Sequence, residues 1–159
     1  MKITIICVGK IKEKFYRDAI SEYEKRLGRY CKLEIVEVAD EKTPNGASAM
    51  LEEQIKEKEA KRVLEKIRDD AFVCILEIAG KRFSSEGFAR WMEQLTINGN
   101  SQIVFVIGGS LGLHGSVRER ADIAVSFSDM TFPHQLMRVI LVEQIYRAFR
   151  IIHKEPYHK

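Results

Sequence analysis

The regular alternation of strand-like and helix-like runs along the chain constrains the fold more than any other feature of the sequence. Short runs rich in β-branched residues alternate with longer runs whose apolar residues recur every three or four positions. The fourth strand-like run holds an unbroken apolar stretch from Ile103 to Ile107, as expected of a parallel strand that is covered on both faces. Strict alternation around such a strand predicts an α/β fold with a parallel sheet.

The strand-like runs cover residues 2–9, 32–40, 71–80, 102–109 and 121–129, and the helix-like runs cover residues 12–30, 50–68, 85–96 and about 133–152. No linker, repeat or low-complexity segment interrupts them, and 159 residues fit one domain of ordinary size. We therefore expect a single domain spanning residues 1–159. In the long helix at 50–68, acidic and basic residues interleave, which favours a solvated face over an RNA-binding one.

Composition excludes few functions but indicates a compartment. The net charge of +3 is compatible with a nucleic-acid partner without demonstrating one. The cysteines Cys7, Cys31 and Cys74 are far apart and form no CxxC pair, so we expect reduced core thiols, no metal and a reducing cytoplasm. The apolar run at the N-terminus is too short for a signal peptide, and no segment has the ~20 apolar residues of a membrane span. We expect neither export nor a membrane.

Three loops are candidate ligand sites, because open α/β sheets bind ligands at the carboxyl ends of their strands. They follow Ile78, Ile107 and Phe127. The second loop, residues 108–115, is rich in glycine but matches neither GxGxxG nor GxxxxGK[ST]. A tight connector explains these glycines as well as a ligand site does. The position of the loop after the most apolar strand favours the ligand site.

Residues 126–133 form a polar bend between the fifth strand and the last helix. Its short polar side chains are suited to cap the helix, and Pro133 is suited to begin it. Capping needs one such residue, however, and the bend has four. We therefore also expect backbone groups that are free to bond an adenine edge, with apolar side chains on either side of the ring. The polar residues are Ser126, Ser128, Asp129 and Thr131, and the apolar ones are Phe127, Met130 and Phe132.

The last helix is apolar on more than one side, which requires two partners, for instance its own sheet and a second subunit. His134 near its start fits a base or ligand, and it also fits a packing or capping residue. Arg138 and Glu143 lie among apolar residues, so each is partnered across an interface or lines a site.

Arg147, Arg150 and Lys154 form a basic stripe that leads into the terminal "EPYHK". A basic stripe of this kind can hold phosphates, while an aromatic residue at its end stacks on a nucleobase. A frayed, solvated terminus is the alternative interpretation.

The runs "FVIGGSLGLH" and "SFSDMTFPHQLMRVILVEQIYRAFRII" and the terminal "EPYHK" resemble the ribosomal RNA large subunit methyltransferase H family, the smallest members of the SPOUT class. The opening "MKITIICVGKIK" and the run "EYEKRLGRY" are similar too, so the resemblance covers the whole chain. One departure is visible, since Lys154 stands where the family usually has a glycine before the tail.

The resemblance implies a homodimer in which the C-terminal part of each parallel sheet is threaded into a deep trefoil knot. It also implies that S-adenosylmethionine is bound in that knot. The positions that match the cofactor-binding ones are Leu76, Gly108, Phe127, Ser128, Asp129, Met130, Thr131 and Phe132.

The reaction that the resemblance implies is methylation of N3 of a pseudouridine in 23S ribosomal RNA, on the assembled 70S ribosome. The site is expected to be composite, with cofactor from one subunit and the tail of the other. Tyr157 is expected to stack on or hydrogen-bond the base, and His158 to assist proton removal or orient the ring. Arg138, Arg150 and Lys159 are expected to hold phosphate or developing charge.

Two other functions fit parts of the sequence. A non-catalytic ribosome-binding factor would use the basic stripe and a vestigial pocket. A nucleotide-binding α/β enzyme would use the glycine loop, but the lysine and acidic partner residues of such sites are missing.

Overall fold

The computed structural model describes residues 1–159 and contains one five-stranded sheet in the order β2-β1-β4-β3-β5. Every pair of neighbouring strands is parallel, so the predicted parallel α/β sheet is confirmed. The strands are β1 (Lys2–Val8), β2 (Lys32–Val38), β3 (Phe72–Arg82), β4 (Gln102–Ile107) and β5 (Ile123–Ser126). The helices are α1 (Lys14–Leu27), α2 (Ala49–Leu64), α3 (Ser85–Ile97), α4 (Gly115–Arg120) and α5 (His134–Ile152).

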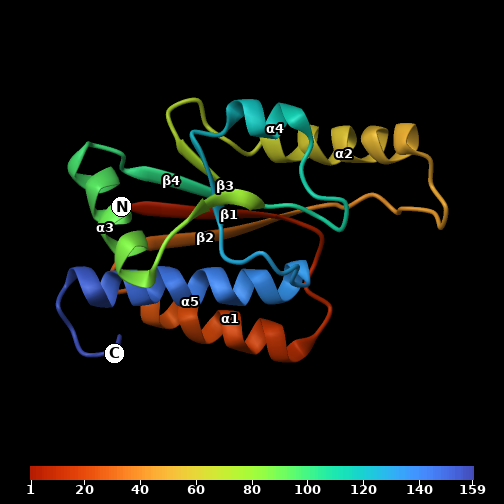
Figure 1. Ribbon diagram of the computed structural model, residues 1–159. Coiled ribbons are helices and arrows are strands. Elements are labelled where there is room, and N and C mark those ends of the chain that lie inside the picture. The colour runs from red at the N-terminus through yellow and green to blue at the C-terminus, as the bar shows by residue number, and fades with distance from the viewer.

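Helices cover both faces of the sheet (Figure 1). Helices α1 and α5 lie side by side on one face, α2 and α4 lie on the other, and α3 packs against α5. Strand β4 at the centre of the sheet supplies both cores. Ile103, Phe105 and Ile107 belong to the larger core, beneath α1, α3 and α5, and Val104 and Val106 belong to the smaller core, beneath α2 and α4. The expectation that this strand is covered on both faces is confirmed.

Strand β3 differs from the prediction. We expected a loop after Ile78, but the strand runs on to Arg82 and carries a bulge, because Leu76 and Lys81 both pair with Val125. A Cβ atom at Gly80 would lie 2.7 Å from the main chain of Val125, so the bulge depends on the close approach of two backbones. A bulge interrupts the two-residue period, which is why the apolar pattern did not reveal it.

Two further features were outside the prediction. Helix α4 begins inside the region that we assigned to a glycine loop, and its six residues are too few for a helical apolar pattern to show. Helix α5 is followed by a left-handed residue, Lys154, with φ of 55°. This is the position at which the resemblance implies a glycine, and glycine adopts such a φ at no steric cost.

The cysteines are buried and free, as predicted for core thiols, and burial raises the pKa of the Cys7 thiol to about 12. None of the helices combines the length and the apolar character needed to cross a membrane.

Candidate functional site

A cavity of about 890 Å³ opens at the carboxyl ends of β3, β4 and β5. The bulge of β3 supplies one wall, the loop after β4 supplies a second, and the bend between β5 and α5 supplies a third. The first residues of α5, His134 and Met137, close it. Three segments distant in sequence therefore meet at the edge of the sheet where α/β proteins bind ligands.

Seven of the eight predicted cofactor-binding residues line this cavity: Leu76, Gly108, Phe127, Ser128, Met130, Thr131 and Phe132. The exception is Asp129, whose carboxylate forms an ion pair with Arg82 instead. The ring of Phe127 packs on the larger core, 6.2 Å from the ring of Phe88. The three apolar residues of the expected sandwich all line the cavity, with Phe127 held against the core and Met130 72% exposed.

The polar residues of the bend shape it rather than cap the helix. The Ser126 hydroxyl donates to the backbone carbonyl of Ser128 at 3.1 Å, and the Ser128 hydroxyl accepts from the backbone N–H of Met130 at 2.9 Å. Pro133 precedes α5, and no side chain caps this helix. The capping interpretation of the bend is therefore wrong. The backbone groups of Thr131 and Phe132 have no partner within the chain, so they are free to bond a ligand.

The glycine loop is both a tight connector and a wall of the cavity. The Gly112 N–H donates to the Gly109 carbonyl at 3.1 Å, and Gly112 has φ of +83°. A Cβ atom at Gly108 would lie 3.0 Å from the Gly112 main chain and 3.1 Å from the Leu113 side chain. Glycine at 108 thus lets the loop fold back tightly, and the residues exposed by that fold face the cavity.

The sequence reasoning missed an ion pair at the cavity wall. Glu77, in the β3 bulge, and Arg118, in α4, both line the cavity, and their side chains lie 2.5 Å apart. The strand that carries Glu77 was predicted, but its bulge and helix α4 were not, so no pattern pointed to this pair.

His134 also lines the cavity. Burial lowers the pKa of its imidazole, and the charge of Arg138 lowers it further. His134 is therefore neutral at pH 7.

Arg138, which was predicted to hold phosphate or developing charge, is enclosed within the chain. Its side chain is 1% exposed, and its guanidinium donates to Glu37 at 2.6 Å and to the backbone carbonyl of Gly9 at 3.0 Å. These bonds tie α5 to the carboxyl ends of β1 and β2. A guanidinium that is enclosed in this way contacts no solvent-borne phosphate.

The basic stripe is largely neutralised within the chain. The guanidinium of Arg147 pairs with Glu143 at 2.6 Å, and Arg150 pairs with Glu155. Lys154 alone is exposed and unpaired. Helical spacing placed these residues on one side of α5, but it could not show that acidic side chains share that side.

The terminal residues lie away from the cavity, along the second half of α5. The Tyr157 hydroxyl donates to Glu143 at 3.1 Å, while the guanidinium of Arg147 lies 4.7 Å from the centre of its ring. Burial, together with hydrogen bonds and the charge of Glu143, raises the pKa of Tyr157 to about 12. Tyr157 is therefore a neutral phenol at pH 7.

His158 makes two contacts, and Lys159 at the end of the chain is exposed. The imidazole Nε2 lies 2.7 Å from Glu86, and Nδ1 lies 3.2 Å from the guanidinium of Arg147. A guanidinium can only donate, so Nδ1 accepts and Nε2 carries the proton toward Glu86.

The tail and the cavity lie at different places along α5. Met137 at the cavity and Arg147 at the tail are ten residues apart, which corresponds to about 15 Å at 1.5 Å per residue.

The comparison with protein families decides what kind of protein has this geometry. Residues 1–158 match the family model described as "Predicted SPOUT methyltransferase". The chain belongs to the SPOUT methyltransferase family. It is 64% identical to the ribosomal RNA large subunit methyltransferase H of Bifidobacterium adolescentis and 61% identical to that of Clostridium beijerinckii. Both alignments cover 100% of each chain. The resemblance to the ribosomal RNA large subunit methyltransferase H family is therefore confirmed over the full length of the chain.

Proposed function

We propose that this SPOUT methyltransferase uses S-adenosylmethionine to methylate N3 of a pseudouridine in 23S ribosomal RNA on the assembled 70S ribosome. The observation that carries the proposal is the cavity at the sheet edge, where the bend between β5 and α5 offers free backbone groups. The similarity of the chain to ribosomal RNA large subunit methyltransferase H proteins supports it. The free main-chain groups of Thr131 and Phe132 suit an adenine edge, which presents both donors and acceptors. Leu76, Gly108 and Met130 supply the apolar surroundings that a nucleoside needs.

S-adenosylmethionine would bring a methyl group bound to a positively charged sulfur. A cavity of about 890 Å³ is large enough for a ligand of this size. Asp129 would act through Arg82, by keeping the bend in place, and not by direct contact. The trefoil knot implied by the family resemblance is part of this proposal, because it would bring the three walls of the cavity together.

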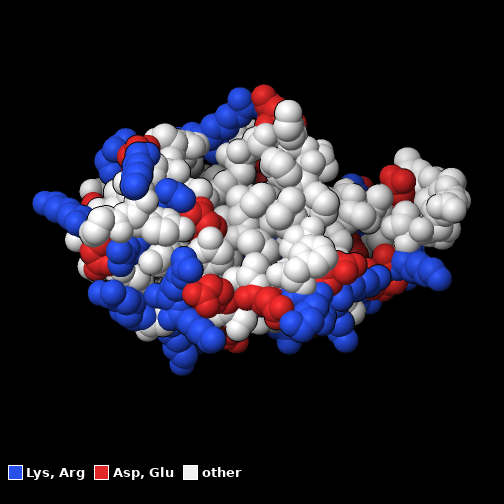
Figure 2. Space-filling model, turned by 90° about the horizontal axis from the view of Figure 1, so that it is seen from below, with Lys and Arg blue, Asp and Glu red and all other residues white.

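We further propose a homodimer, because one chain does not complete the site. Residues 157–159 are absent from the cavity wall, so a cofactor held there requires a tail from a second copy. Helix α5 offers a surface for that copy, since Leu136 and Ile140 are partly exposed on one side of it. Figure 2 shows a broad area without charged side chains at the centre of the face seen from below, with charged side chains of both signs at its left and along its lower edge.

The residues of the tail have distinct tasks in the proposed transfer. Tyr157 stays protonated, so it stacks on or donates to the base instead of removing a proton. His158 can accept the N3 proton on Nδ1 only after Arg147 has moved from that nitrogen. Glu86 beside Nε2 then stabilises the imidazolium. Lys159 is free to contact phosphate.

Methyl transfer to ribosomes tests the proposal directly. The purified protein is incubated with labelled S-adenosylmethionine and either 70S ribosomes or free 23S RNA from cells that lack the gene, and RNA fragments are analysed by mass spectrometry. We expect one methylated pseudouridine, and only in the 70S sample. Deleting residues 157–159 should abolish transfer and leave cofactor affinity, measured by calorimetry, within about twofold. Equal loss of both would contradict the division of labour, and ribosome binding without cofactor heat would favour the non-catalytic factor.

A further inference from the structure

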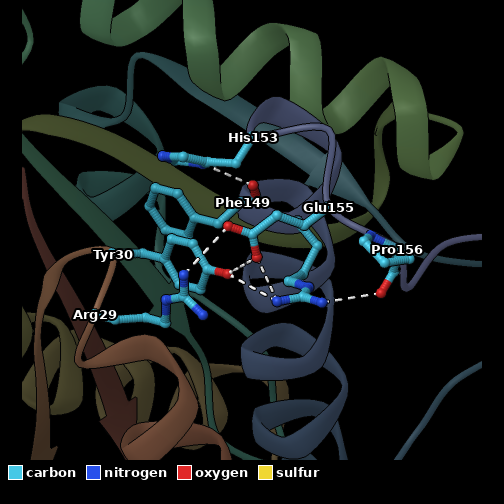
Figure 3. Close-up of polar contacts among 7 residues, drawn as sticks. Arg29, Tyr30, Phe149, His153, Glu155 and Pro156 are labelled. Carbon is cyan, nitrogen blue, oxygen red and sulfur yellow. Dashed lines mark hydrogen bonds and ion pairs between the residues drawn. The ribbon is translucent and has the colours of Figure 1, made fainter.

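The start of the C-terminal tail is held by a side-chain network that the proposed methyl transfer does not use (Figure 3). Glu155 lies at its centre. Its carboxylate accepts from the Tyr30 hydroxyl at 2.5 Å, pairs with Arg150 and lies 3.4 Å from the guanidinium of Arg29. Tyr30 belongs to the turn between α1 and β2, 125 residues before Glu155 in the chain. The network therefore joins the tail to a distant part of the fold.

The same network fixes the main chain at the point where the tail leaves α5. The N–H of Lys154 donates to the Ile151 carbonyl at 3.0 Å, and the N–H of Glu155 donates to the Arg150 carbonyl at 2.9 Å. This pair of bonds is the Schellman arrangement that closes a helix. The second arm of the Arg150 guanidinium donates to the Pro156 carbonyl at 2.9 Å. Arg150 thus holds both the Glu155 side chain and the peptide group that directs Tyr157.

Tyr30 is itself held rigidly. Its ring stacks on Phe149 with centres 5.4 Å apart and planes 8° from parallel, and it meets the edge of Tyr146 at 6.2 Å. The Tyr30 hydroxyl also accepts from Arg150 at 3.2 Å. The Nε atom of Arg150 is buried and has no hydrogen-bond partner, which costs free energy. The contacts of this guanidinium with Tyr30 and the tail therefore hold it in place despite one unsatisfied donor.

We propose that Tyr30 and Arg150 are positioning residues that, through Glu155, aim Tyr157 and His158 for methyl transfer. The inference rests on the proposed function, because it takes the tail to be the part that meets the base. Neither residue lines the cavity, so neither contacts a cofactor bound there. A tail with a fixed starting direction loses less conformational freedom when it reaches the second subunit, and small errors of placement cost much of the rate of a transfer reaction.

The test is the substitution Tyr30→Phe, which removes one hydroxyl and keeps the ring. We expect kcat for methyl transfer to fall about tenfold, the loss of one positioning hydrogen bond, while KM and the Kd for S-adenosylmethionine stay unchanged. The melting temperature should move by less than about 2 °C. The matched control is Tyr16→Phe, because the hydroxyl of Tyr16 on α1 makes no hydrogen bond within the chain. It should leave kcat unchanged.

A second measurement reports the tail without any enzymatic turnover. Carboxypeptidase B removes a C-terminal lysine, here Lys159, and it should act faster on Tyr30→Phe and Glu155→Ala proteins than on the Tyr16→Phe control. Glu155→Gln keeps an acceptor for Tyr30 but loses the charge that pairs with Arg150, so its rate should lie between those of wild type and Glu155→Ala.

The outcomes separate this inference from the proposed function. Wild-type kcat in Tyr30→Phe, or unchanged release of Lys159, would overturn the positioning role even if the wild-type protein methylates ribosomes. A wild-type protein that transfers no methyl group would refute the proposed function, and lysine release would still show whether Tyr30 holds the tail. A fall in kcat that is matched by a weaker cofactor Kd would also count against positioning, because a residue that only aims the tail leaves the cavity intact.

Discussion

Replacing the two members of the Arg138–Glu37 ion pair should show that Arg138 supports the fold. Arg138 is 1% exposed, whereas Glu37 is 37% exposed, so the two charges differ in their access to water. Glu37→Gln removes the counter-charge of the buried guanidinium and leaves it only neutral acceptors, the amide oxygen at position 37 and the Gly9 carbonyl. Removing one partner of a buried pair costs about 3–5 kcal/mol, but the access of Glu37 to water lowers our expectation to about 2–3 kcal/mol.

Arg138→Met should cost a similar amount for a different reason. It leaves no buried charge, since Glu37 can turn to solvent, but the buried carbonyl of Gly9 loses its donor at a cost of about 1–3 kcal/mol. In the double variant Glu37→Gln/Arg138→Met neither charge remains. Its cost should therefore equal that of Arg138→Met alone, which gives a coupling energy of about 2 kcal/mol.

Urea unfolding of the four proteins of this cycle, at pH 7 and at one protein concentration, measures these costs. A fixed concentration is needed because dimerisation would add to the apparent stability. For a chain of this length, 2 kcal/mol corresponds to about 4–8 °C in Tm. A cost below about 0.5 kcal/mol for Glu37→Gln would refute the reasoning, because an enclosed guanidinium cannot lose its counter-charge so cheaply. Weaker ribosome binding by Arg138→Met at unchanged stability would restore the phosphate-binding role.

Three further substitutions or titrations test other parts of the structure. Gly80→Ala should lower the free energy of unfolding by at least about 2 kcal/mol in urea melts, because its Cβ would meet the Val125 backbone at 2.7 Å. The control Gly115→Ala has open space around its Cβ and should be neutral or slightly stabilising. Lys154→Gly should raise Tm by about 1–4 °C by relieving the left-handed backbone, and calorimetry that shows a fall would contradict this. In NMR titrations of ¹³C-labelled tyrosine rings, Tyr157 should still be protonated at pH 11, since its pKa is raised to about 12. The interactions that raise the pKa therefore stabilise the fold below pH 10 and are lost as the pH rises through 12.

The sequence by itself determined the layers of the fold and one region of the site. Apolar periodicity located all five strands and the four long helices, because burial on one face or on both leaves a pattern within a few neighbouring residues. The family motifs in "SFSDMTFPHQLMR" pointed to the bend that lines the cavity. Both kinds of information lie in continuous segments, so no tertiary structure is needed to read them.

Tertiary structure decided everything that depends on partners distant in sequence. Arg138 meets Glu37 across 101 residues, and this contact gives its guanidinium a partner within the chain that no sequence pattern could show. The β3 bulge forms because of the approach of β5, and Glu155 meets Tyr30 only when α5 lies against the turn after α1. A side chain's role depends on which groups neutralise or enclose it, and the chain brings those groups together only when it folds.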